Sequence, residues 1–236
     1  MTYELFYWPG IPGRGEFVRL AFEATGTAYR DVCREEGTGE MFRLMDAAGI
    51  NTPSFAPPIL RDGDVIVGQA ALILHFLGPR LGLVPENEML RFWTHQIQLT
   101  IVDFVAEIHD THHPVGGDFY YEEQKREALR RAGTFRNSRL PKFFGWFESI
   151  IKRNASGWLV GDEMSYVDLS LFLLVEGLTY GFPKTVAKAM PDYPLIASVH
   201  DMVAALPRIA TYLKSTRRQA FNEDGIFRFY PELEDA

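Results

Sequence analysis

Three features of the first eighty residues bring together polar groups that suit a small ligand. Tyr7 stands near the end of an aromatic-rich run, Tyr3 to Trp8, which is typical of a strand covered on both faces. Pro57 and Pro58 precede a second strand-forming run, and an X-Pro bond is the one peptide bond with a readily accessible cis form. Gln69 stands at the start of an apolar helical run, whose first N–H groups favour an anion. We therefore expect a phenol, a turned strand end and an anion-binding helix start to meet at one edge of a sheet.

The segments around these residues predict a βαβαββα unit. Because strands and helices alternate, we expect parallel pairing and a sheet covered by helices. In chain order the pattern first predicts a strand over 3–8, a helix over 14–25, a strand over 28–33 and a helix over 40–48. Strands at 59–60 and 65–67 then flank the Asp62-Gly63 turn. A helix over 70–77 follows and stops before Pro79.

Beyond this unit nearly every periodic segment is helical. We expect helices over 92–108, 122–151, 165–176, 196–205 and 207–213, followed by a polar and aromatic tail from Phe221. Ser165 to Asp168 fits a capping box, with Met164 and Leu169 as a hydrophobic staple. The sequence therefore predicts an α/β domain over 1–80, a linker over 81–90 and an all-helical domain over 91–236.

Composition restricts the class of protein and of partner. The 236 residues are 47% hydrophobic, which is ample for a buried core, and the net charge of −7 argues against a nucleic-acid or anionic membrane surface. Cys33 is the only cysteine, so no intramolecular disulfide or cysteine metal cluster can form. The N-terminus lacks signal-peptide character, and the apolar runs fall short of the roughly 20 residues of a membrane span. We expect a cytoplasmic protein whose partner is a small molecule or another protein.

A group of histidines follows the first long helix of the second half. His109, His112 and His113 have the i, i+3, i+4 spacing that can hold a metal on one helix face. Pro114 and the glycines after it indicate that the helix ends there, and histidines at a helix C-terminus are electrostatically favourable without any ion. We therefore expect no metal.

The ordered set of motifs resembles the tyrosine-type cytosolic glutathione S-transferases, the alpha, mu, pi and sigma-like classes. The resemblance spans residues 1 to about 215. The first motif is Tyr7-Trp8 followed by Gly13, Arg14, Glu16 and Arg19, which resembles the first strand and helix of that family. The second is the Pro58-x-Leu60-x-Asp62-Gly63 hairpin, and the third is Gln69-Ala70, where the family has an acidic or amide residue followed by serine. The fourth is Gly161-Asp162 with Ser165 to Asp168, which resembles the capping segment of the helical domain.

The resemblance implies a thioredoxin-like domain that binds glutathione as co-substrate, an all-α C-terminal domain that supplies a pocket for a small hydrophobic electrophile, and a homodimer. It implies that Tyr7 and Arg14 act at the glutathione sulfur. The resemblance also implies that glutathione is bound by Trp8, Arg43, Ala56, Pro57, Pro58, Gln69, Ala70 and, from the neighbouring subunit, Asp103. For the second-substrate pocket we name Pro12, His109 and His113.

The chemistry of the thiol explains why a hydroxyl is needed. A free thiol with a pKa near 8.5 is only about 3% ionised at pH 7. Lowering that pKa by about two units requires roughly 2.7 kcal/mol of selective stabilisation, much of which one charge-assisted hydrogen bond supplies. No serine occurs before Ser54, and Cys33 closes the second expected strand, so Tyr7 is the expected donor.

Several residues depart from the family pattern. One extra residue separates Tyr7 from Arg19, and Ala70 has no hydroxyl for the γ-glutamyl carboxylate. If the bond before Pro58 is cis, as the spacing to the turn favours, Pro57 offers the cysteinyl backbone only its carbonyl; if Pro57 is itself cis, Ala56 supplies both groups. Because each missing hydrogen bond costs on the order of 1 kcal/mol, we expect modest glutathione affinity.

Three hypotheses follow. The first is an enzyme that ionises glutathione with Tyr7 and adds it to an electrophile. The second is a binding or regulatory protein that keeps the fold without catalysis, which the weakened glutathione subsite favours. The third is a glutathione-dependent isomerase or peroxidase that uses the same site on a different substrate.

Overall fold

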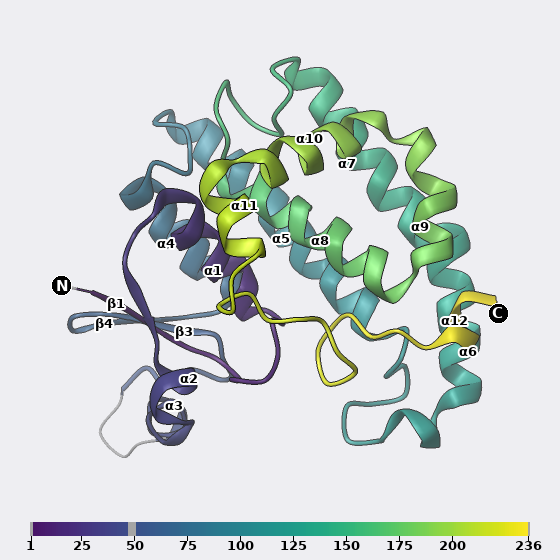
Figure 1. Ribbon diagram of the computed structural model, residues 1–236, viewed down its shortest axis with the longest axis horizontal. Coiled ribbons are helices and arrows are strands. Elements are labelled where there is room, and N and C mark those ends of the chain that lie inside the picture. Colours follow the sequence, from purple (N-terminus) through teal and green to yellow (C-terminus); the bar gives the residue numbers. More distant parts are fainter. Residues whose placement is uncertain (1, 47–50, 236) are drawn as a thin grey trace.

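A computed structural model describes residues 2–46 and 51–235 of the chain, and its N-terminal part is built on a four-stranded sheet (Figure 1). The strand order is β2-β1-β3-β4, in which β1 pairs parallel with β2 and antiparallel with β3, and β3 pairs antiparallel with β4. The sheet is therefore mixed, with one parallel pair. The strands are β1 Tyr3–Phe6, β2 Tyr29–Asp31, β3 Ile59–Asp62 and β4 Val65–Gly68.

Helices cover both faces of this sheet (Figure 1). Successive strand residues point to opposite faces, and accordingly Leu5 packs in the cluster that α1 and α4 cover, whereas Phe6 packs with α2 and α3. The covered sheet predicted from the alternating pattern is confirmed. These helices are α1 Gly15–Thr25, α2 Val32–Glu36, α3 Gly39–Asp46 and α4 Ala70–Leu81.

The rest of the chain is all helical and contains the largest hydrophobic cluster. Helix α8 is buried almost all round, because it contacts α1, α5, α9 and α10. The helices are α5 Glu88–His109, α6 Lys125–Thr134, α7 Leu140–Asn154, α8 Tyr166–Gly181, α9 Pro183–Ala189, α10 Pro194–Ala205, α11 Pro207–Leu213 and α12 Pro231–Asp235, with 3-10 turns at Tyr121–Glu123 and Met190–Asp192. Among the described residues no helix is both long and apolar enough to cross a membrane.

The start of α8 confirms the predicted capping box. The carboxylate of Asp168 accepts the Ser165 N–H and hydroxyl, each at 2.8 Å, and the Leu159 N–H at 2.9 Å. Asp168 is fully buried. Since one side chain satisfies three donors from two segments, it fixes the loop before α8 to the helix start.

Three predictions in the N-terminal part are wrong in detail. The strand expected over 3–8 ends at Phe6. The strand expected over 28–33 ends at Asp31, and Cys33 lies on α2. Helix α4 does not stop at Pro79 but continues to Leu81, where Gly82 in the left-handed conformation donates its N–H to the Gly78 carbonyl. Proline removes a single donor, and the left-handed glycine ends the helix instead. The last residues of the helix expected over 40–48 lie outside the described residues.

The long helix expected over 122–151 is divided. A 3-10 turn precedes α6, and a π-helical segment, Phe135–Arg139, joins α6 to α7. The π segment ends two residues before Pro141, which cannot donate to a preceding carbonyl. Helix α5 starts four residues earlier than expected, because the Asn87 side chain accepts the Leu90 N–H at 3.1 Å.

The C-terminal tail runs back across the molecule from α11 to α12, shown in yellow in Figure 1. Asn222 donates to the Gly10 carbonyl at 3.0 Å, so the tail holds the loop between β1 and α1. Further along, the Tyr230 ring stacks on Tyr121 with the centroids 3.7 Å apart. The tail is thus part of the packed structure.

Candidate functional site

The Tyr7 side chain lies at the junction of β1 and α1. Its ring is 4% exposed and packs so closely on Gly13 and Gly15 that a Cβ at Gly13 would lie 2.2 Å from the hydroxyl oxygen. That oxygen accepts the backbone N–H of Arg14 at 2.8 Å. The first turn of α1 therefore holds the phenol oxygen, while the hydroxyl hydrogen is left for another acceptor.

The electrostatics of Tyr7 favour a neutral phenol. Burial raises the pKa of Tyr7 above its ordinary value, which the Arg14 N–H and the Arg14 and Arg19 guanidinium groups only partly counteract. The phenol is therefore protonated at pH 7 and acts as a hydrogen-bond donor. Arg19 is itself buried, held by Asp31 at 2.7 Å and by the Pro12 carbonyl at 3.2 Å.

A cavity of about 350 Å³ lies between α1, α4 and α5 and contains three of the expected site residues. Arg14 reaches it from the start of α1, and Gln69 and Ala70 reach it from the start of α4. The backbone N–H groups of the first turn of α4 have no partner within the helix, because its first internal bond runs from Ile73 to the Gln69 carbonyl at 2.9 Å. The cavity thus combines a guanidinium, an amide and a helix N-terminus, which together suit a carboxylate.

Gln69 adopts an unusual backbone conformation, with φ at +67°. Residues other than glycine rarely adopt a positive φ, and those that do cluster at functional sites. The conformation turns the chain sharply from β4 into α4.

The cis bond is the one between Pro57 and Pro58, as the spacing favoured. Pro58 is buried, whereas Ala56 and Pro57 are partly exposed. The N–H-free Pro57 is therefore the residue before the cis bond.

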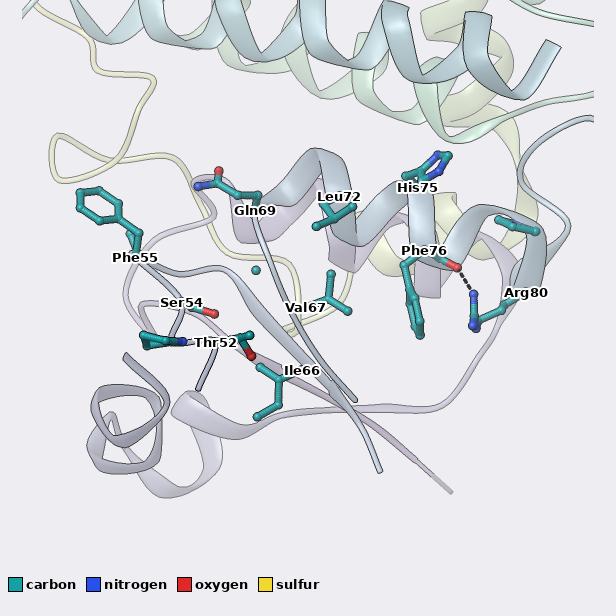
Figure 2. Close-up of a pocket in the computed structure, with 14 residues that line it drawn as sticks. Thr52, Ser54, Phe55, Ile66, Val67, Gln69, Leu72, His75, Phe76 and Arg80 are labelled. Carbon is teal, nitrogen blue, oxygen red and sulfur yellow. Dashed lines mark hydrogen bonds between the residues drawn. The ribbon is translucent and has the colours of Figure 1, made fainter. Parts of the chain in front are cut away.

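Ala56 and Gln69 also line a second cavity, of about 600 Å³, between α4, β4 and the loop before β3 (Figure 2). Figure 2 shows Leu72 of α4 and Val67 of β4 facing each other in it, with Phe55 projecting from one end. The Phe55 side chain is 91% exposed. An aromatic ring this exposed at the end of an apolar cavity is typical of a contact with another chain.

Several expected site residues line neither of these two cavities, among them Trp8, Arg43, Asp103 and Pro12. Trp8 packs edge-on against Phe42 of α3. Arg43 forms an ion pair with Glu40 one turn earlier on the same helix. Asp103 is exposed on α5, and Pro12 is buried beneath the loop that follows β1.

The histidines at the end of α5 form one compact group. His112 is buried, and its Nε2 lies 2.8 Å from the Ile226 carbonyl of the tail. Burial lowers the pKa of His109 to about 4 and that of His112 to about 2, with smaller contributions from neighbouring charges. Both rings are neutral at pH 7.

Two cavity residues on α5 were not predicted. His95 and Gln98 line the 350 Å³ cavity together with apolar residues of the same helix. Gln98 is buried and accepts the Ser170 hydroxyl of α8 at 2.8 Å, and the Nδ1 atom of His95 is buried without a partner. The signal for both was present in the sequence, as polar residues spaced three apart on an otherwise apolar helix face.

Comparisons with known proteins agree with this geometry. Residues 109–216 match the family model described as glutathione S-transferase, C-terminal domain. The chain is 24% identical over 225 residues to the glutathione S-transferase of Plasmodium falciparum (isolate 3D7), covering 92% of this chain and 98% of that protein. It is 28% identical over 221 residues to glutathione S-transferase P 1 of Xenopus laevis, covering 92% and 93%.

The fold is shared with solved structures. The Pi-class glutathione S-transferase of Onchocerca volvulus matches with a TM-score of 0.71 at 21% identity, covering 95% of this chain and 99% of that one. The fold, the match of the helical part and the full-length relatives agree. Residues 109–216 therefore belong to the glutathione S-transferase C-terminal domain family, and over most of its length the chain is similar to glutathione S-transferases.

Proposed function

We propose that this protein is a glutathione transferase that joins the glutathione sulfur to a small hydrophobic electrophile. The observation that carries the proposal is the hydroxyl of Tyr7 at the first turn of α1, next to an arginine that shares a cavity with Gln69 and Ala70. In this proposal residues 1–80 bind glutathione and residues 91–236 form the pocket for the electrophile. The reaction takes place in the cytoplasm, where the thiol pool is kept reduced.

In the reaction the thiol loses its proton to solvent, and Tyr7 donates its hydroxyl hydrogen to the resulting thiolate. The Arg14 guanidinium adds positive charge near the sulfur. The thiolate then attacks an electrophilic carbon, so that a carbon–sulfur bond forms and the leaving group departs with its electron pair. A neutral phenol suits this role, because a donor must carry its proton to stabilise the anion.

The remainder of glutathione is held by the start of α4 and the loop before β3. The γ-glutamyl carboxylate lies at the unpaired N–H groups of α4 and the Gln69 amide, without help from a hydroxyl at Ala70. The cysteinyl backbone meets Ala56 and the Pro57 carbonyl. The glycine carboxylate meets Arg43 and Trp8 beside α3, which requires Arg43 to be shared with Glu40.

The electrophile occupies the space next to the end of α5. His109 and His113 border it, and the side chain of His109 is close enough to Arg14 for the guanidinium to affect its pKa. Pro12 acts there through the loop after β1, since its own side chain is buried. A pocket bordered by neutral imidazoles accepts uncharged aromatic or alkyl electrophiles more readily than cationic ones.

We further propose that the protein is a homodimer. Large apolar side chains are exposed on the loop before β3 and along α4 and α5. In this proposal they make up one interface, which we call the α4–α5 face: Phe55 91%, Leu72 49%, Met89 69%, Phe92 57% and Leu99 48% exposed. A twofold contact through this face would insert Phe55 beside Leu72 of the partner. It would also bring Asp103, exposed on α5, toward the glutathione amine of the partner subunit.

Two measurements on the intact protein test the proposed function. Glutathione must raise the melting temperature in a concentration-dependent way, because it binds only the folded state. Conjugation to an activated aryl chloride must then be faster with the protein than without it. Stabilisation without turnover would instead support the non-catalytic binding protein, and the absence of stabilisation at millimolar glutathione would exclude both.

A further inference from the structure

Three imidazole rings converge where α5 ends. His109 is the last residue of the helix, and the N–H groups of His112 and His113 both donate to its carbonyl, at 3.2 and 3.1 Å. This tight turn keeps the three side chains on one side of the chain. The ring centroids lie 4.8 to 5.0 Å apart, and one ligand nitrogen from each residue lies within 4.8 Å of the others.

The orientation of His112 is set by the tail. Because a carbonyl can only accept, the Nε2 of His112 carries the proton that it donates to Ile226 O at 2.8 Å. The lone pair is therefore on Nδ1, which faces the Nδ1 of His113. A ring whose second nitrogen donates to a backbone carbonyl has the arrangement that metal-ligating histidines show.

We propose that His109, His112 and His113 form a binding site for a divalent first-row transition ion, for which Zn²⁺ is the reference. A tetrahedral zinc ion with Zn–N distances of about 2.0–2.1 Å places its ligand nitrogens about 3.4 Å apart. The Nδ1 atoms of His112 and His113 lie closer together than that value, and all three ligand nitrogens lie within 4.8 Å of one another. Rotation of the partly exposed His109 and His113 rings would adjust these separations to the tetrahedral value. This geometry replaces the expectation of no metal drawn from the helix end alone.

The charges around the group determine what completes the coordination. Arg14 and Arg228 are close enough to act electrostatically on His109, and Glu122 acts on His113. Because two guanidinium groups repel a dication, an anion such as hydroxide or chloride in the fourth position is required to offset their charge. Three neutral imidazoles with one exchangeable anion are a ligand set of the catalytic zinc type, which leaves a position open.

The test uses tag-free, full-length protein treated with a chelator and then titrated with Co²⁺. Four-coordinate Co²⁺ shows intense visible absorption that the hydrated ion lacks, so the wild-type spectrum tests the site without any substitution. We expect one ion per chain, displaced by Zn²⁺, which binds imidazole ligands more tightly. A spectrum of hydrated Co²⁺ throughout the titration would refute the proposal.

Substitutions then locate the site. His109→Ala and His113→Ala should each weaken Zn²⁺ binding by at least about 10- to 100-fold, measured by competition with a chromophoric chelator. The matched control is His200→Ala, whose ring contacts Glu176 of α8 and Asp201 of its own helix α10; this variant should bind Zn²⁺ like the wild type. Equal affinity in wild type and in both cluster variants would place the ion elsewhere and overturn the assignment. Because no readout involves glutathione, failure here is distinguishable from failure of the proposed transferase function.

Discussion

The backbone N–H of Arg14 donates to the hydroxyl oxygen of Tyr7 at 2.8 Å, so the first turn of α1 holds the phenol through the main chain. The bond does not depend on the Arg14 side chain, which points into the cavity that Gln69 and Ala70 share. A phenol whose oxygen already accepts a hydrogen bond is a stronger donor of its own hydrogen. Positioning of the hydroxyl and positive charge near the sulfur therefore come from separate parts of one residue.

Removing the hydroxyl should uncouple binding from chemistry. We expect Tyr7→Phe to lower conjugation by about 10- to 1,000-fold with little change in glutathione affinity, because only the thiolate is stabilised by the donor. Turnover and calorimetric binding are measured on the same preparation. Tyr29→Phe is the control, since that hydroxyl donates to Glu23. Unchanged turnover in the Tyr7 variant would refute its role.

Restoring a hydroxyl at the start of α4 should strengthen glutathione binding. Ala70 is 7% exposed and lines the 350 Å³ cavity. One added hydrogen bond to the γ-glutamyl carboxylate is worth on the order of 1 kcal/mol, so we expect Ala70→Ser to bind glutathione about fivefold more tightly. Ala71→Ser is a matched control, because Ala71 lines the same cavity one position further along the helix. If both substitutions changed glutathione affinity equally, or if neither changed it, the γ-glutamyl carboxylate would not bind at the start of α4.

Local signals in the sequence predicted much of this architecture. The Ser165 to Asp168 capping box, the hairpin around Gly63 and the choice of Pro58 depend on interactions within a few residues, and all three match the structure. Tyr7 directly follows the first strand, which ends at Phe6, and lies beside the start of α1. Such features can be predicted because the residues that determine the local structure lie in the same short segment as the structure itself.

Features that depend on distant segments were not predictable. His95 and Gln98 line a cavity only because α5 packs beside α1 and α4 in the folded chain. The orientation of His112 depends on Ile226, 114 residues later in the chain. The extension of α4 past Pro79 likewise follows from the packing of its last turn, since Gly78 lies against Tyr166 of α8. Tertiary contacts of this kind can outweigh the local tendency of a residue such as proline to end a helix.

The α4–α5 face should determine the oligomeric state. Phe55 is 91% exposed, so Phe55→Ser removes apolar surface from the proposed interface without opening a cavity in the monomer. We expect sedimentation equilibrium to give a dimer for the wild type and a dissociation constant at least about tenfold higher for the variant. Phe119→Ser, exposed before α6, is the control. A monomeric wild type at micromolar concentration would refute the proposed homodimer.

The buried carboxylate at the start of α8 should affect stability in a pH-dependent way. Burial raises the pKa of Asp168 to about 6, although three hydrogen-bond donors oppose the shift. The unfolded chain has the ordinary value of about 3.9, so the folded state binds this proton more tightly. The contribution is therefore fully present below about pH 4 and is lost as the pH rises through 6.

Asp168→Asn tests both the bonds and the sign of this linkage. The amide keeps one acceptor but its NH₂ group cannot accept from Ser165, so we expect the free energy of unfolding to fall by about 1–3 kcal/mol at pH 7.5. Because asparagine does not titrate, the difference from wild type should be larger at pH 4.5 than at pH 7.5. Urea unfolding at both pH values measures it, with the exposed Asp162→Asn as control. A difference that grows toward high pH would mean that the folded state holds the carboxylate in its charged form, and that the donors outweigh burial.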